Sequence, residues 1–224
     1  MKKKSCVWLV CVLLCVTVMG KAQVVTLENG FGISSMRYKG IGQALDKIHP
    51  HHVSLGMQYL DKGWFNLSSN VGYLRRGERD KEEPTSVWAG SYQVIGINLH
   101  YLTLNTTFDL KKMSRDSYTC YIGVGPRIDF LLKSSADLYG GDNNYAKQTI
   151  DGFHSVLFGL KCVGGIRKDF GCMQIGLNFA YLPSFTRLNP ATRDRTFTFG
   201  LSLGYKLGAG KEKAETIRSV RRHK

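Results

Sequence analysis

The chain has 224 residues, with 31 lysines and arginines against 17 aspartates and glutamates, so its formal net charge is +14. Hydrophobic residues make up 43% of it and charged residues 21%, which excludes a disordered chain, and its 25 glycines follow no Gly-X-Y period, which excludes collagen. The longest apolar run, residues 6–20, is shorter than the roughly 18 residues of a membrane-spanning helix, so the sequence also excludes an α-helical membrane protein.

The N-terminus has the features of a secretory signal peptide. Three lysines at positions 2–4 precede the apolar run, and Gly20-Lys21-Ala22 follows it with small residues at the two positions that a signal peptidase reads. We therefore expect residues 1–22 to be a cleaved signal peptide, with an uncleaved anchor helix as the alternative. Cleavage would remove four lysines and no acid, which lowers the net charge from +14 to +10.

Three cysteines remain after cleavage: Cys120, Cys162 and Cys172. An odd number in an exported protein does not form a disulfide framework. We expect them to be small buried apolar side chains.

The first predicted strands alternate between apolar and polar residues. In residues 53–59 the odd positions are apolar and the even positions are Ser54, Gly56 and Gln58; residues 65–72 follow the same rule, and a shorter strand is expected at residues 31–38. Successive side chains of a strand point to opposite faces. Each of these strands therefore has one apolar face and one polar face.

The fourth predicted strand departs from this alternation. The apolar residues at positions 95, 97 and 99 share one parity, whereas those at 102, 104 and 108 share the other. A β-bulge near Tyr101 would shift the phase. Alternatively, residues 92–100 belong to a long hairpin outside the membrane. The sequence leaves both interpretations open.

Alternation returns in residues 118–132, 156–165, 172–182 and 196–207. Pro126 interrupts the first of these segments and, because it has no N–H, needs a bulge or an unpaired position. The last two segments alternate most strictly. The side chains that we expect to face lipid are Phe197, Phe199, Leu201, Leu203, Tyr205, Ile175, Leu177 and Phe179.

The connections between the eight predicted strands alternate in length. Residues 39–52, 75–91, 133–152 and 183–195 are long gaps, and residues 62–63, 111–116 and 168–171 are short ones. Outer-membrane barrels have this pattern, with tight periplasmic turns and long extracellular loops.

We therefore predict an all-β fold: an eight-stranded antiparallel up-and-down transmembrane β-barrel at residues 23–207, followed by a basic periplasmic tail at residues 208–224. In hydrocarbon every backbone N–H and C=O needs a partner within the protein, so the sheet must close on itself. A secreted or periplasmic β-sandwich, or a lipocalin-like barrel, is the alternative. It would turn the apolar faces inward.

Several segments resemble the PorT-like outer-membrane β-barrel family of Bacteroidota. They are NVGYLRRG at residues 70–77, YLTLNTTF at 101–108, YIGVGPRIDFLL at 121–132 and FGLSLGYKL at 199–207, and they follow one another in the family's order. The second segment lacks a proline that the family tends to have. The resemblance implies an outer-membrane barrel and, for part of that family, service to a secretion apparatus. It favours an envelope component or a secretion accessory.

Arg127, Asp129 and Lys161 fall on the polar parity of neighbouring predicted strands. An eight-stranded barrel is filled by side chains, and buried charges need partners. We therefore predict an ion-pair network in the lumen. The alternative, a selectivity ring, would need a wider barrel. A narrow channel is a further functional alternative.

His49, His51 and His52 cluster in the first long loop. Imidazoles suit zinc, copper or nickel, but no second group of ligands is evident. We expect a solvated loop without a metal or another cofactor. A loop metal site is the alternative.

A lipid-modifying enzyme of the deacylase or acyltransferase type would need a histidine beside a serine. His154 and Ser155 are adjacent on a predicted strand and therefore point to opposite faces, which leaves His100 as the other candidate. We expect no enzymatic activity.

The basic loop residues indicate a different partner. We expect them to meet lipopolysaccharide phosphates, as basic segments meet anionic headgroups, whereas no basic helix or stacking platform indicates nucleic acid. An envelope or secretion-machinery protein is a further expected partner. The basic loop residues are Lys39, Lys47, Lys133, Lys147, Arg187 and Arg193.

Overall fold

The computed structural model describes residues 24–39, 46–80, 92–113, 118–140 and 144–207, so the predicted signal peptide and basic tail lie outside the described residues. In the described part, no helix is long and apolar enough to cross a membrane. The strands are β1 (Val24–Tyr38), β2 (Asp46–Lys47), β3 (His51–Tyr59), β4 (Phe65–Arg79), β5 (Tyr92–Met113), β6 (Tyr118–Gly140), β7 (Asn144–Thr149), β8 (Val156–Phe170), β9 (Met173–Tyr181) and β10 (Thr192–Lys206).

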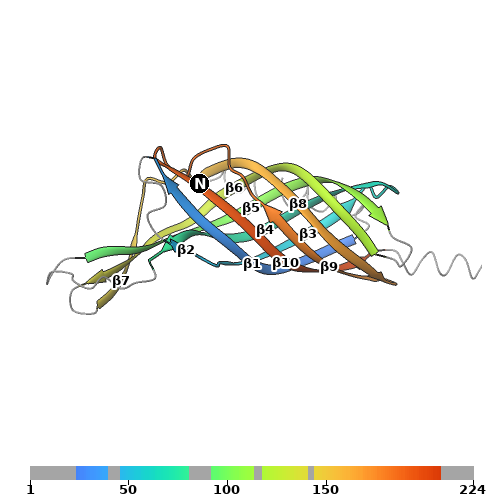
Figure 1. The fold of residues 1–224 in the computed structure, drawn as a ribbon, viewed down its shortest axis with the longest axis horizontal. Coiled ribbons are helices and arrows are strands. Elements are labelled where there is room, and N and C mark those ends of the chain that lie inside the picture. The colour runs from blue at the N-terminus through green and yellow to red at the C-terminus, as the bar shows by residue number, and fades with distance from the viewer. Residues whose placement is uncertain (1–23, 40–45, 81–91, 114–117, 141–143, 208–224) are drawn as a thin grey trace, which may run out of the picture.

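Eight of these strands close into one antiparallel barrel (Figure 1). Each pairs with its neighbours in the order β1, β3, β4, β5, β6, β8, β9 and β10, and β10 pairs back with β1. The predicted all-β, eight-stranded up-and-down architecture is confirmed. Long and short connections alternate around it as the sequence indicated, and Gly171, with a φ of 62°, helps to form the shortest turn, between β8 and β9.

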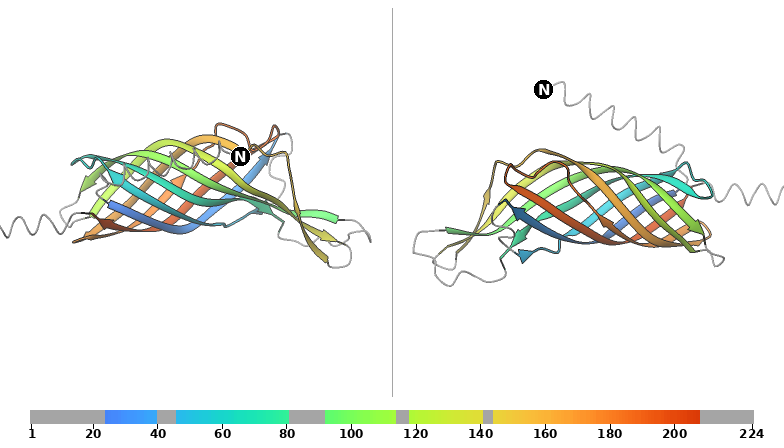
Figure 2. Two further views of the ribbon diagram at one scale, coloured as in Figure 1. Left: turned by 180° about the vertical axis from the view of Figure 1, so that it is seen from behind. Right: turned by 45° about the horizontal axis from the view of Figure 1, so that its top comes forward.

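The two short strands lie at the long-loop end of the barrel. β2 pairs with the end of β4, and β7 pairs with the end of β6. Together with the start of β5, β6 and β7 form a three-stranded extension that projects beyond the barrel wall (Figures 1 and 2). The sequence pattern predicts a loop for residues 133–152. For residues 92–100 its alternative is a long hairpin, and the pairing of Tyr92 with Gly140 and of Val94 with Leu138 beyond the barrel agrees with that alternative.

The two faces of the barrel are chemically opposite. Inward-facing positions of β10 such as Thr196 and Thr198 are at most 5% exposed, whereas the outward positions from Phe197 to Tyr205 are apolar. A lipocalin-like barrel would have the reverse arrangement. The eight side chains expected to face lipid are between 41% and 66% exposed: Phe197, Phe199, Leu201, Leu203, Tyr205, Ile175, Leu177 and Phe179.

The unusual pattern of β5 has a cause that the sequence did not indicate. A register irregularity does lie between His100 and Tyr101, where the partner in β6 changes from Lys133 to Leu131 and leaves Leu132 as the extra residue. The side chains of β5, however, keep their parity through this point, because Leu99 and Tyr101 are both fully buried inside the barrel. The apolar residues change face because the interior itself is apolar at this end.

Pro126 lies in the middle of β6 on the outer face. It is in register with Leu160 of β8, but the ladder between β5 and β6 is interrupted between the pairs Asn105–Arg127 and Phe108–Val124. A residue without an N–H is accommodated at such a gap in the ladder.

The three cysteines of the described chain are free. The prediction that all of them are buried is wrong for Cys120 and Cys172, which are exposed. Cys120 lies on the outward parity of β6, and Cys172 lies in the turn between β8 and β9. A small apolar side chain suits a lipid-facing wall as well as a core.

Candidate functional site

The interior at the long-loop end is closed by apolar side chains. Met36, Leu99, Tyr101, Leu157 and Leu188 form one cluster, and each is 0% exposed. Leu188 belongs to the connection between β9 and β10, which folds inward: the Leu188 amide donates to the Thr192 carbonyl at 3.0 Å, and its carbonyl accepts from the His154 amide at 2.9 Å. A segment predicted to be an extracellular loop therefore contributes to the plug.

A network of charged side chains lies beside the apolar cluster, since Arg76 is in register with Leu99 and Asp129 with Leu157. Arg76 donates to Asp129 at 2.6 Å and pairs with Asp194 at 3.0 Å, and Arg127 pairs with the same Asp129 oxygen at 3.0 Å. All four side chains are at most 1% exposed. The Arg76 guanidinium also lies 5.1 Å from the centre of the Tyr101 ring. Two cations and two anions balance there, as buried charges must.

Two members of this network, Arg76 and Asp194, fall in segments that the sequence pattern assigns to solvated loops. β4 continues to Arg79, and β10 begins at Thr192, so both residues lie on strands. The signal was the parity of β4: Gly72 and Leu74 face inward, and Arg76 follows on the same parity. Because positive and negative charges are equal in number at residues 75–91, the sequence pattern indicated a solvated loop there and not an inward position for Arg76.

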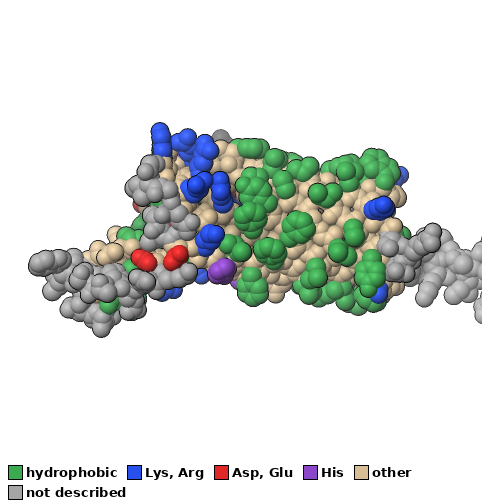
Figure 3. All heavy atoms as spheres, in the orientation of Figure 1, with side chains coloured by type: hydrophobic (Ala, Val, Ile, Leu, Met, Phe, Trp, Pro, Cys, Tyr) green, Lys and Arg blue, Asp and Glu red, His purple; other side chains and the backbone are tan. Residues whose placement is uncertain are grey.

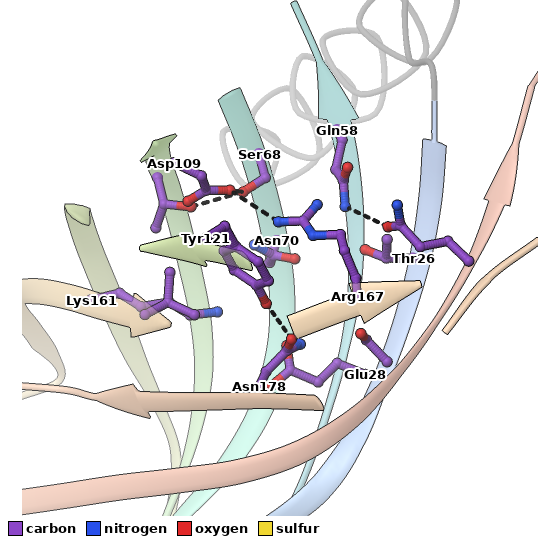
Figure 4. A pocket seen from close by; sticks show the side chains of 14 residues that line it. Thr26, Glu28, Gln58, Ser68, Asn70, Asp109, Tyr121, Lys161, Arg167 and Asn178 are labelled. Carbon is purple, nitrogen blue, oxygen red and sulfur yellow. Dashed lines mark hydrogen bonds and ion pairs between the residues drawn. The ribbon is translucent and has the colours of Figure 1, made fainter. Parts of the chain in front are cut away.

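Lys161 lies in a second interior group, nearer the short-turn end (Figure 4). There it interacts electrostatically with Glu28, which also pairs with His52 at 3.2 Å. The sequence pattern places Lys161 with Arg127 and Asp129. The structure separates them because Lys161 and Arg127 lie at different heights along the barrel: Gly125, not Arg127, is the partner of Lys161 in the register of β6 and β8.

A third set of polar contacts surrounds Asp109. Its carboxylate accepts hydrogen bonds from Ser68 at 2.9 Å and from Asn66 at 3.2 Å, and Arg167 lies 4.0 Å away (Figure 4). The Arg167 guanidinium stacks 3.7 Å from the centre of the Tyr121 ring. Ser68, Asp109, Tyr121 and Arg167 line a cavity of about 40 Å³, which has room for only a few water molecules. The interior at this end is polar and contains this cavity, whereas the apolar cluster at the long-loop end is fully buried.

The histidines of the predicted loop point in different directions. His51 and His52 are the first residues of β3, not part of a loop. His51 faces outward beside Phe31, with ring centres 5.7 Å apart, while His52 faces inward to Glu28. His49 is exposed. Among the described residues, no group of three or more His, Cys, Asp or Glu side chains is arranged to hold a metal.

The residues considered for lipid hydrolysis are also separated. Nδ1 of His100 is hydrogen-bonded to the hydroxyl of Tyr73 on the outer wall. His154 and Ser155 are both exposed and precede β8. Within the described ranges, no hydrogen bond joins either histidine to Ser155.

The basic residues of the loops divide into a cluster and scattered positions. Lys39, Arg187 and Arg193 line one groove of about 580 Å³ where β1 ends and β10 begins, together with Arg37 and Arg195, which the sequence pattern does not single out. Lys and Arg side chains visibly gather at this end of the barrel (Figure 3). The other three expected residues, Lys47, Lys133 and Lys147, belong to or adjoin different strands.

No protein-family model and no curated protein sequence matches the chain. Among solved structures, it is similar to Neisserial surface protein A, with 12% identity over 82% of this chain and 96% of that one and a TM-score of 0.50. It is also similar to OprG from Pseudomonas aeruginosa (13% identity; 84% and 97% covered; TM-score 0.48) and to a major outer membrane protein from Thermus thermophilus (12%; 82% and 99%; 0.43).

The first of these similarities shows a shared fold. The closed sheet with its apolar exterior is what a membrane requires, since closure leaves the barrel without a free sheet edge. The protein is a small β-barrel of the outer membrane.

Proposed function

We propose that this protein is a non-enzymatic component of the outer membrane that binds a protein partner of the cell envelope at its long-loop end. The observation that carries the proposal is the three-stranded extension of β5, β6 and β7. It projects past the end of the barrel, as Figure 2 shows from two sides. With the barrel in the membrane, the extension would lie outside the lipid.

The extension has the properties of a binding surface. Tyr92 and Val94 are 56% and 45% exposed on one face of it, and Tyr145 is 53% exposed on the other face. Apolar side chains gain nothing from exposure to water, and grouped apolar residues on a surface outside the lipid commonly mark a protein contact. Among the described residues β7 pairs only with β6, so its outer edge presents backbone groups to which another strand could add.

The filled interior supports the same role. The apolar cluster and the Arg76–Asp129–Arg127 network occupy the lumen where a channel would need an open path. Service to a secretion apparatus is the more specific form of the proposal, and it rests on the resemblance to the PorT-like family. A narrow channel and a lipid-modifying enzyme are the competing functions.

Site-specific photo-crosslinking in cells tests the proposal. A photoreactive amino acid at position 145 should capture a specific envelope protein, whereas the same group at Tyr118, which is 41% exposed at the short-turn end, should not capture that protein. Unitary conductance steps in a planar bilayer, or identical captures from both positions, would count against it.

A further inference from the structure

Three arginines lie side by side on the outer wall at the long-loop end. Arg37 of β1 is directly opposite Arg193 of β10 in the strand register, and Arg195 follows two residues along on the same face. All three are exposed. Lys39 and Arg187 line the same groove, whose walls are held together by the Lys39 amide donating to the Ala191 carbonyl at 2.9 Å.

No carboxylate in the described residues pairs with any of these five cations. Asp194 borders the groove, but its side chain is 0% exposed and is paired with Arg76 inside the barrel. Like charges directly opposite each other destabilise a strand pair. The cluster therefore carries a repulsion that an anion in the groove would relieve.

Several lysines at the other end of the barrel have interaction partners. Lys206 pairs with Asp169 at 2.8 Å, Lys111 pairs with Asp61, and Lys168 lies 4.4 Å from the centre of the Tyr118 ring. Among the described residues, two of these lysines thus have a carboxylate partner, whereas none of the five cations of the arginine groove has one.

The groove adjoins the lipid-facing surface. Tyr181 lines it and stacks on Phe197, with ring centres 4.7 Å apart and planes 24° apart. Phe199 and Leu201 continue the exposed apolar face from there. Aromatic girdles of outer-membrane barrels lie at the membrane–water interface. The arginines therefore lie just beyond this interface, toward the long-loop end, at the level of lipid headgroups in the outer leaflet.

We propose that this groove binds the phosphate groups of an outer-leaflet lipid with a diphosphorylated sugar headgroup, the chemistry of the lipid A part of lipopolysaccharide. Guanidinium groups suit this ligand because their planar donors bind phosphate oxygens in pairs. The lipid's acyl chains would lie against Tyr181, Phe197 and Phe199. The proposal uses the membrane placement of the barrel and not its protein partner, so it goes beyond the proposed function and can hold or fail separately.

The test uses the full chain refolded in lipopolysaccharide-free detergent micelles and titrated with diphosphoryl lipid A, with retained lipid measured by native mass spectrometry. The variant R37Q/R193Q/R195Q is compared with K62Q/K112Q/K168Q, which removes the same charge at the short-turn end. We expect the arginine variant to lose about tenfold or more in affinity, because each charge-assisted contact with phosphate is strong. The lysine variant should stay within about twofold, as exposed charges contribute little.

Two further arms identify the ligand. Lipid A without its phosphates should bind about as weakly to the native protein as diphosphoryl lipid A binds to the arginine variant. Inorganic pyrophosphate at the same concentration should not displace the lipid. Equal losses of affinity in the two triple variants would overturn the proposal, because binding would then depend only on net charge. Full displacement of the lipid by pyrophosphate would also overturn it, because the groove would then be a site for a soluble anion.

Folding of each variant is checked by its heat-modifiable migration on gels. Without lipid A, the arginine variant should be at least as resistant to heat as the native protein, because like charges have been removed. A loss of heat resistance in lipid-free micelles would give the arginines a structural role instead.

Discussion

The two halves of the barrel interior accommodate buried charged side chains in different ways. At the long-loop end, the dry half, fully buried apolar side chains close the lumen. The charged groups Arg76, Asp129 and Arg127 there have only protein partners, namely one another, Asp194, the Leu160 carbonyl and the Ser184 hydroxyl. At the short-turn end, polar groups around Asp109 surround a small cavity with room for water. Charge in the dry half depends on its protein partners, whereas charge in the wet half can also be solvated. The contrast predicts where substitutions are costly.

The largest effect is expected from Asp129→Asn. It removes the carboxylate that two buried guanidinium groups share and leaves them with Asp194, so the free energy of unfolding should fall by about 3–5 kcal/mol. Urea titration of the barrel in liposomes measures this. The matched change in the wet half, Asp109→Asn, should cost about 1–2 kcal/mol, because its partners are hydrogen-bond donors and a distant arginine. Equal losses would remove the distinction between the two halves.

The apolar cover gives the next effect. Leu99→Ala creates a cavity among side chains that are fully buried, and we expect a loss of about 2–5 kcal/mol in the free energy of unfolding. Val163 lines the polar cavity and is 7% exposed, so Val163→Ala should cost about 1 kcal/mol. The same titration compares them, and a larger loss at Val163 would contradict a dry plug.

The outer wall provides a third comparison. Leu203→Arg places a charge in the hydrocarbon and should cost about 2–4 kcal/mol if the position is near the midplane. Leu207→Arg, on the same face but beyond the end of β10, should cost much less because an arginine there reaches the interface. Equal tolerance of arginine at both positions, measured by refolding into vesicles, would refute the assignment of this face to lipid.

The smallest effect is at the short-turn rim, outside the spanning segments. Partial burial would raise the pKa of Asp169, but hydrogen bonds from Lys206 and Gln174 outweigh it and hold the pKa below its usual value. A depressed carboxyl pKa contributes stability above the unfolded-state pKa and loses it as the pH falls through the folded-state pKa. Lys206→Met should therefore reduce the loss of unfolding free energy as the pH is lowered. The reduction should be less than about 1 kcal/mol because the pair is partly exposed, and urea titrations at several pH values measure it.

The sequence was most informative where one face meets lipid and the other meets a polar interior. In β9 and β10 the alternation alone assigned Leu177 and Leu201 to the exposed wall. It failed at the long-loop end, where β5 places Leu99 inside and the alternation no longer separates lipid from lumen. The charged network shows the same limit: Arg127 was identified from its parity, but Arg76 and Asp194 were hidden in segments that looked like solvated loops.

The amino-acid sequence by itself determined the number of barrel strands, their antiparallel order and which face of most of them is apolar, because these follow from a period of two and from the alternation of connection lengths. The tertiary structure alone decided which charges meet. Arg76 and Asp129 are 53 residues apart, and whether they touch depends on register and height in a closed barrel. The same holds for Arg37 and Arg193, since only closure of β1 on β10 brings the first and last strands together.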